Sequence, residues 1–168
     1  MSRSTDPLAE PKAIGEDIEQ LVVDAVDGLR AAVDPEDWYD AHVETTIGPR
    51  TAEDVIFASI SLLEAGTLVE IKACKRRVSN GTRNRDGLWT FQVDQHEKLV
   101  KESAVYLLAI YDDVGGTKQL EEIVVSPASI VDECLIGRWY DVDRHEGRVA
   151  QLGWPHVLGD QEVSADAE

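Results

Sequence analysis

The run Ala104–Tyr111 constrains the fold most strongly, because it is almost wholly apolar. A strand with one face in water alternates apolar and polar residues, and this run does not. It is also far shorter than the roughly 20 residues that cross a bilayer. A strand of this composition must be covered on both faces. The run therefore predicts an α/β fold, in which a central mixed β-sheet is flanked by helices.

Other apolar patterns fit the same architecture. Ile14–Val33 has apolar residues at helical spacing and ends at Asp34-Pro35, which predicts a helix. Gly66–Cys74 alternates as a strand does. The further expected elements are a short helix and then a strand at His42–Ile47, a strand at Leu88–Phe91, a helix opening at Asp94, a strand at Leu120–Val125, a helix at Ala128–Cys134, and peripheral strand and turn pieces at Gly137–Asp141 and His145–Gln151.

The segment from Thr51 to Gly66 fits two structures. Its apolar spacing suits a helix that ends near Gly66, and it equally suits a strand with a hairpin turn before Gly66. We expect a short extended start near Asp54 and a helical remainder.

The chain is expected to form one domain with two tails. Residues 1–12 and the acidic residues 159–168 are predicted to be disordered, and residues 13–158 to form the single domain. The N-terminal residues lack the apolar core of a secretory signal, and no apolar run is long enough for a membrane span, so we expect a cytoplasmic protein.

The net charge of −17 has two interpretations. A strongly acidic balance usually disfavours nucleic-acid binding. Adaptation to high salt is the other explanation, because acidic surfaces stay hydrated there and the Debye length falls to about 3 Å at 1 M. We interpret the charge as halophilic, from a haloarchaeal or haloviral source, so that local basic segments say more about partners than the total does.

This interpretation predicts that salt stabilises the protein. The free energy of unfolding should rise from low to multimolar KCl, because salt screens the repulsion among the acidic residues. Chemical denaturation at several KCl concentrations measures it. A flat or falling dependence would contradict halophilic adaptation.

Two ionisable residues lie on one face of an otherwise apolar strand. Within Gly66–Cys74, Glu70 and Lys72 point to the same side, and the apolar residues beside them point to the other. A charged group at a buried position is costly unless it pairs, binds a metal or reaches a cleft. The alternative is a surface ion pair, which contributes little to stability.

The segment after this strand reverses the sign of the charge. From Lys72 to Arg85 there are six basic residues and no acidic one, in a chain with 16 basic and 33 acidic residues. We expect Arg76–Gly87 to be a mobile loop that binds phosphates, against the alternative of a solvated basic face. The residues assigned to nucleic-acid binding are Lys75, Arg76, Arg77, Arg83 and Arg85.

The order of these features resembles the PD-(D/E)xK nuclease superfamily, and within it archaeal Holliday-junction resolvases and restriction-endonuclease-like enzymes. The matching order is an N-terminal helix, an acid at Asp54, the strand with Glu70-Ile71-Lys72, a basic loop, Gln95 opening a helix, and the apolar strand. The resemblance covers about residues 14–125. It implies a restriction-endonuclease-like fold and a DNA endonuclease that uses Mg²⁺, with Mn²⁺ as a substitute.

The resemblance also implies roles for single residues. Asp54 and Glu70 would be carboxylate ligands of the metal, and the carbonyl oxygen of Ile71 would complete them. Lys72 would orient or deprotonate the attacking water, or stabilise charge on the phosphate, and Gln95 would position that water. Asp54 is the least secure of these, because Glu53 and Glu64 remain rivals for its place.

Two further residues carry weaker assignments. Glu19, or Glu16 beside it, would hold a second metal or a water from the first helix. His96 would contact DNA or a leaving oxygen, and a surface histidine is the alternative.

The partners that follow are DNA and, for an enzyme that cuts symmetric junctions, a second copy of the chain in a homodimer. Two rival functions remain. One is a non-catalytic nucleic-acid-binding module with a decayed site. The other is a regulatory or structural haloarchaeal protein in which Glu70 and Lys72 form only a surface ion pair.

Overall fold

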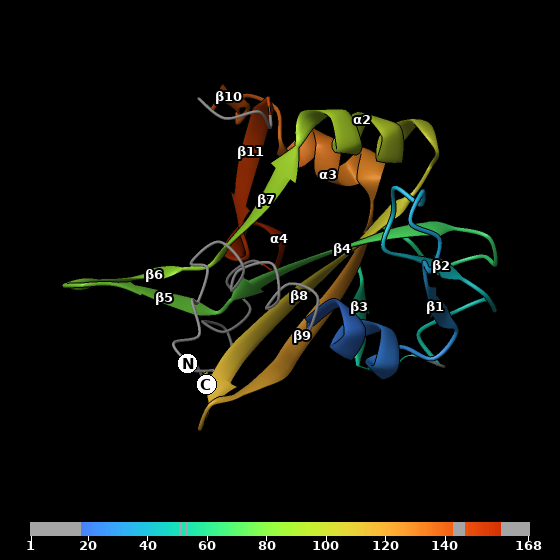
Figure 1. Cartoon of the computed structure of the whole chain (residues 1–168), viewed down its shortest axis with the longest axis horizontal. Helices are drawn as coiled ribbons and strands as arrows, with labels where there is room; N and C mark the ends of the chain where they lie inside the picture. Colours follow the sequence, from blue (N-terminus) through green and yellow to red (C-terminus); the bar gives the residue numbers. More distant parts are fainter. Residues whose placement is uncertain (1–17, 51, 53, 143–146, 159–168) are drawn as a thin grey trace, which may run out of the picture.

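A six-stranded mixed sheet forms the centre of the protein in the computed structural model, which describes residues 18–50, 52, 54–142 and 147–158 (Figure 1). Its strand order is β1-β2-β4-β8-β9-β3. The pairs β4–β8 and β9–β3 are parallel, and the other neighbours are antiparallel. The strands are β1 (Leu29–Ala31), β2 (Ala41–Val43), β3 (Val55–Phe57), β4 (Leu68–Lys75), β8 (Val105–Val114) and β9 (Thr117–Pro127).

A second layer of short elements covers one face of this sheet. An antiparallel sheet of order β10-β11-β7 belongs to it, together with three helices. The strands are β7 (Leu88–Gln92), β10 (Tyr140–Asp141) and β11 (Arg148–Gly153). The helices are α2 (Val93–Lys101), α3 (Ala128–Cys134) and α4 (Pro155–Leu158). Figure 1 shows α2 and α3 side by side on this face.

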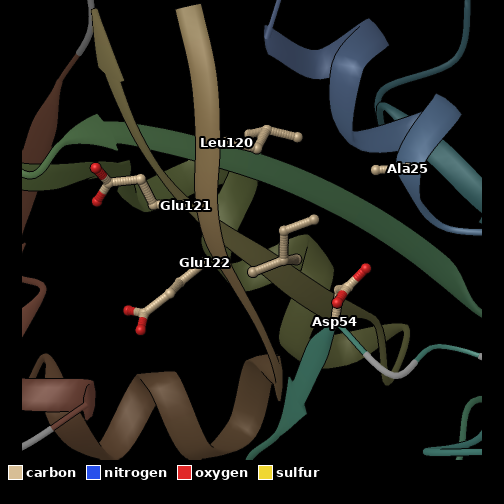
Figure 2. Close-up of a pocket in the computed structure, with 6 residues that line it drawn as sticks. Ala25, Asp54, Leu120, Glu121 and Glu122 are labelled. Atoms are coloured by element: carbon tan, nitrogen blue, oxygen red, sulfur yellow. The ribbon is translucent and has the colours of Figure 1, made fainter. Parts of the chain in front are cut away.

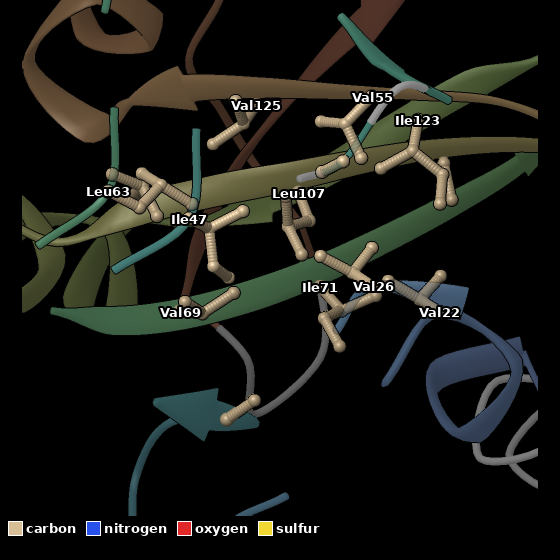
Figure 3. Packing of buried hydrophobic residues seen from close by; sticks show 14 of the residues in the cluster. Val22, Val26, Ile47, Val55, Leu63, Val69, Ile71, Leu107, Ile123 and Val125 are labelled. Atoms are coloured by element: carbon tan, nitrogen blue, oxygen red, sulfur yellow. The ribbon is translucent and has the colours of Figure 1, made fainter. Parts of the chain in front are cut away.

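The apolar strand β8 is buried on both faces, as its sequence predicts. Val105 and Leu107 belong to one core cluster, which the N-terminal helix (residues 18–25) and the segment around Leu63 complete (Figure 3). Tyr106 and Leu108 belong to the other, with Trp89, Phe91 and residues of α3. The predicted α/β class with a mixed, helix-flanked central sheet is confirmed.

The predicted N-terminal helix is too long at its C-terminal end. The described helix covers residues 18–25 and gives way to β1 after Gly28. Gly28 has φ +97°, and a Cβ there would lie 2.8 Å from Ile47. This conformation and close contact favour glycine and end the helical path, so the apolar residues that follow join the sheet instead.

Two other predicted helices are absent from the described residues. β2 is a strand without the short helix expected before it, and the segment after β3 up to Gly66 is irregular rather than helical. Ile47 and Leu63 form an isolated antiparallel bridge there and are buried. The apolar residues of this segment are there because they are buried in the core, and their spacing is also the one that an amphipathic helix would have. The predicted disordered tails lie outside the described residues.

The predicted basic loop is a β-hairpin rather than a loop. β5 (Arg77–Asn80) pairs with β6 (Arg83–Asp86) in antiparallel register, and Figure 1 shows this ribbon projecting from the body near the end of β4. None of the helices in the described part of the chain has the length and apolarity needed to cross a bilayer.

Gly87 lies at the base of this hairpin, in close contact with the backbone of β4. Adding one methyl group there should therefore destabilise the protein strongly. A Cβ at Gly87 would lie 1.7 Å from the carbonyl oxygen of Lys75, so the backbone must shift in Gly87→Ala. We expect this variant to lose about 2–3 kcal/mol of unfolding free energy. Chemical denaturation measures it, with Gly48→Ala as the control, because a Cβ at Gly48 meets nothing within 4 Å. Equal stability of the two variants would contradict the close approach.

Candidate active site

The candidate site lies where the central sheet has an unpaired edge. β2 pairs with β4 only through Ala41 opposite Val69 and His42 opposite Leu68. Beyond this point Asp40 takes the place of a strand: its backbone N–H donates to the Val69 carbonyl (3.1 Å), and its carboxylate Oδ2 accepts the Ile71 N–H (2.8 Å). The sheet edge therefore ends at a carboxylate instead of a further strand.

Glu70 is the buried acid next to this edge. Its side chain lies on the face of β4 that the second layer covers, and the residue is only 4 % exposed. Its Oε1 accepts a hydrogen bond from Gln95 Nε2 at 2.7 Å. Its Oε2 is buried and has no hydrogen-bond partner among the described residues. One oxygen of this carboxylate is thus left for a ligand or a proton.

Lys72 and Gln95 complete the group of side chains around Glu70. Lys72 Nζ lies 3.6 Å from Glu70 Oε1 and donates to Gln95 Oε1 at 3.4 Å. Gln95 comes from the first turn of α2, which β7 positions over β4. The predicted trio of Glu70, Lys72 and Gln95 therefore converges, and Lys72 is partly exposed (22 %), which leaves its ammonium group within reach of a substrate.

Burial raises the pKa of both acids. Burial and the charge of Asp40 raise the pKa of Glu70 to about 8, although Lys72 and Gln95 oppose the shift. Burial also raises the pKa of Asp40, against the Ile71 N–H and Lys72. Two acids this close repel each other when both are ionised. The pair is therefore built to hold a positive species, a proton or a cation.

The donor set of this pair fits a hard divalent cation. Asp40 and Glu70 supply carboxylate oxygens, and Ile71 adds a backbone carbonyl, which projects to the same edge of β4 as its N–H. Among the described residues, no three His, Cys, Asp or Glu side chains are grouped so that they would hold a metal. Waters and a phosphate oxygen would complete the shell, as Mg²⁺ prefers.

Asp54 does not join this site. It precedes β3 at the opposite edge of the sheet, and β8 and β9 separate β3 from β4, which is about 14 Å of sheet. Asp54 lines a pocket of about 400 Å³ together with Glu121 and Glu122 of β9, and Figure 2 shows that the carboxylates of the two glutamates point away from Asp54. Asp40, and not the predicted Asp54, lies beside Glu70. Of the rival acids, Glu64 lies exposed in the turn before β4, and Glu53 lies outside the described residues.

Glu19 and His96 have different environments from each other. The half-buried Glu19 lies near enough for its charge to raise the pKa of Glu70, so the first helix does bring an acid towards the site; Glu16 lies outside the described residues.

His96 is 2 % exposed, with Nδ1 2.7 Å from the Tyr106 hydroxyl and Nε2 2.9 Å from Asp132. A histidine buried in this network is not accessible to DNA, which contradicts both expectations for it.

The predicted nucleic-acid-binding residues divide into two groups. Three are paired with acids: Lys75 with Asp113 (2.8 Å), Arg76 with Glu121 and Glu122, and Arg77 with Asp86 (3.2 Å). The Arg76 guanidinium also lies 4.9 Å from the centroid of the Trp154 ring. Arg83 and Arg85 are exposed on the hairpin. The Arg76 pairs attach the hairpin base to β9, the Arg77–Asp86 pair joins the two strands of the hairpin, and the Lys75–Asp113 pair joins β4 to β8.

A model of the PD-(D/E)XK nuclease superfamily domain matches residues 4–159, which is most of the chain. The protein therefore belongs to this superfamily, and the match indicates a nuclease. Nucleases of this superfamily typically use divalent metal ions. No curated protein and no solved structure matches the chain.

Sequence reasoning missed Asp40. A signal was present, because Asp40 directly precedes the alternating run Ala41-His42-Val43 and therefore lies at the end of a predicted strand. Its separation of thirty residues from Glu70, across an irregular segment, gave no spacing rule to connect the two.

The raised pKa of Glu70 predicts a pH-dependent stability of the metal-free protein. The folded state keeps a proton on Glu70 up to about pH 8, whereas the unfolded state releases it near pH 4.5. Stability from this group is therefore complete below pH 4.5 and is lost as the pH rises through 8. From pH 6 to pH 8.5 the melting temperature in EDTA should fall about 5 °C more in the wild type than in Glu70→Gln.

Saturating Mg²⁺ provides the control for that measurement. A bound cation stabilises the ionised carboxylates, so it should abolish the additional fall in the wild type and leave Glu70→Gln unaffected. Parallel melting curves of the two proteins in EDTA would show that Glu70 does not hold its proton.

Proposed function

We propose that the protein is a metal-dependent DNA endonuclease, with Asp40, Glu70 and Lys72 at its active site. One observation carries the proposal. The buried Glu70 carboxylate shares the unpaired edge of β4 with Asp40 and Lys72, and one of its oxygens has no donor among the described residues. Membership of a nuclease superfamily supports the same function.

Asp40, Glu70 and the Ile71 carbonyl would hold the metal, for which we propose Mg²⁺ with Mn²⁺ as a substitute. A divalent cation at this position would lower the pKa of a bound water and neutralise charge on the scissile phosphate. The chain supplies the rest. Lys72 offers an ammonium group, 3.6 Å from Glu70 Oε1, to the phosphate or to the attacking water.

Gln95 acts on both Glu70 and Lys72 through its single amide group. The amide nitrogen donates to Glu70, and the amide oxygen accepts from Lys72. Gln95 therefore fixes the carboxylate and the ammonium relative to each other. It is in addition close enough to orient a water between them, which is the role that the family resemblance implies.

We propose branched DNA, such as a four-way junction, as the substrate, and a homodimer as the form that cuts it. Two copies related by a two-fold axis present two sites to two strands. Light scattering with and without a junction tests the dimer. The substrate is tested by comparing cleavage of a junction with that of linear duplex and single-stranded DNA.

The site predicts which substitutions abolish cleavage. Asp40→Asn, Glu70→Gln and Lys72→Ala should each slow cleavage roughly 10²-fold or more, because each removes a charge that acts on the transition state. Binding of DNA should be largely kept. Gel-based cleavage in Mg²⁺ and in Mn²⁺, with fluorescence anisotropy for binding, measures both.

Asp54→Asn is the matched control, because Asp54 is an acid beside the same sheet in a different pocket. It should cleave as the wild type does. Loss of cleavage in Asp54→Asn with retention in Asp40→Asn would move the metal site to the other sheet edge. Binding without cleavage by the wild type would favour a decayed nuclease module.

A further inference from the structure

The β5–β6 hairpin is a ribbon with two different faces. Residues that pair directly across an antiparallel ribbon point to the same side. Arg77 pairs with Asp86, and Ser79 pairs with Asn84, so one face carries an ion pair and small polar groups. The opposite face carries Arg83 and Arg85. The cations without an acid partner among the described residues are thus confined to one face.

This cationic face continues into a hollow at the base of the hairpin. Arg85 lines a cavity of about 330 Å³ with Arg138, His156 and Gln151. These residues come from four separate parts of the chain, and Arg138 is held by a hydrogen bond from Nε to the Cys134 carbonyl (3.1 Å). The acidic residue among the described lining residues is Asp86, whose carboxylate is bound to Arg77.

The chemistry of this surface suits phosphate groups. A guanidinium group presents a planar fork of donors that matches phosphate oxygens. Arg83 and Arg85 are two residues apart on one strand, so they are spaced by about 6.6 Å along the ribbon. Elsewhere the chain carries a large negative charge that repels a polyanion. A concentration of exposed arginines on one face therefore identifies where a polyanion can approach.

The strands fix the distance between the hairpin arginines and the candidate site. β4 leads from Lys72 to the hairpin base, and Figure 1 shows the hairpin extending onward from the end of β4. Arg85 pairs with Val78 and Arg83 with Asn80, which are six and eight residues beyond Lys72. At about 3.3 Å per residue these arginines lie about 20 and 26 Å away. That corresponds to about 6–8 base pairs of duplex.

We infer that Arg83, Arg85, Arg138 and His156 form a second DNA contact, which binds the phosphate backbone of a duplex arm about 6–8 base pairs from the scissile phosphate. The inference rests on the proposed nuclease function, since it assumes that DNA is the substrate. It separates the basic segment into two roles. Lys75, Arg76 and Arg77 form ion pairs within the fold, and Arg83 and Arg85 contact the DNA.

The test measures cleavage of DNA with a long or a short arm, by the wild type and by a variant that lacks the two arginines. Once the cut has been mapped on a long substrate, two substrates are made whose arm ends about 4 or about 12 base pairs beyond it. Both are cleaved by the wild type and by Arg83→Gln/Arg85→Gln. On the long arm we expect the double variant to lose roughly tenfold or more in kcat/KM. On the short arm the two proteins should have equal kcat/KM, because that arm is too short to reach the hairpin in either protein.

Salt dependence gives a second measurement that a change in folding would not imitate. Anisotropy of the labelled long duplex, with Glu70→Gln in every protein to prevent cleavage, gives the slope of log K against log salt. The slope should fall by about 2 when two phosphate contacts are removed. Arg30→Gln/Arg148→Gln is the matched control. It also removes two exposed arginines, but these are ion-paired and lie outside the hairpin, so the slope should stay unchanged.

The outcomes separate this inference from the proposed function. Cleavage by the wild type with equal rates for Arg83→Gln/Arg85→Gln on the long arm would overturn the second contact and leave the nuclease intact. An equal loss on both arms would overturn it as well, because the arginines would then act at the cut itself. A wild type that neither cleaves nor binds any of these DNAs would defeat both.

Discussion

The hydrogen bond from the Ile71 N–H to the Asp40 carboxylate is the contact on which the rest of the site depends. β2 begins one residue after Asp40, so β4 keeps an unpaired edge there and its backbone needs a partner. A carboxylate satisfies the N–H and also brings a negative charge beside the buried Glu70. Removing the acid would leave a buried donor unpaired and would separate the two charges that a cation requires. The Asp40 side chain therefore both completes the hydrogen bonding of β4 and supplies a charge to the candidate metal site.

The sequence predicted those parts of the fold and site that depend on local pattern. The all-apolar run of β8 implied a sheet covered on both faces, and the alternation of β4 placed Glu70 and Lys72 together. Asp40 was missed because its role comes from where β2 ends relative to β4, a relation between segments that no local period encodes. The stretch around Leu63 was misassigned for a similar reason, since burial against the sheet made an irregular segment look amphipathic.

Charge is distributed unevenly over this acidic protein. In the basic segment, some cations are paired with acids and others are exposed on one face of the hairpin. The sequence showed a basic stretch of one sign, but the fold pairs Lys75, Arg76 and Arg77 with acids from β8, β9 and β6. A count of basic residues cannot distinguish a cation that holds two strands together from one that is presented to solvent. The register of β5 and β6 makes that distinction, because it sets which arginines share a face.

Anomalous scattering from crystals grown with Mn²⁺ tests the central claim most directly. The account predicts a metal within coordinating distance of the Asp40 and Glu70 carboxylates and the Ile71 carbonyl, with Lys72 and Gln95 beside it. A metal between Asp54 and the glutamates of β9, or none at Glu70 under saturating Mn²⁺, would contradict it.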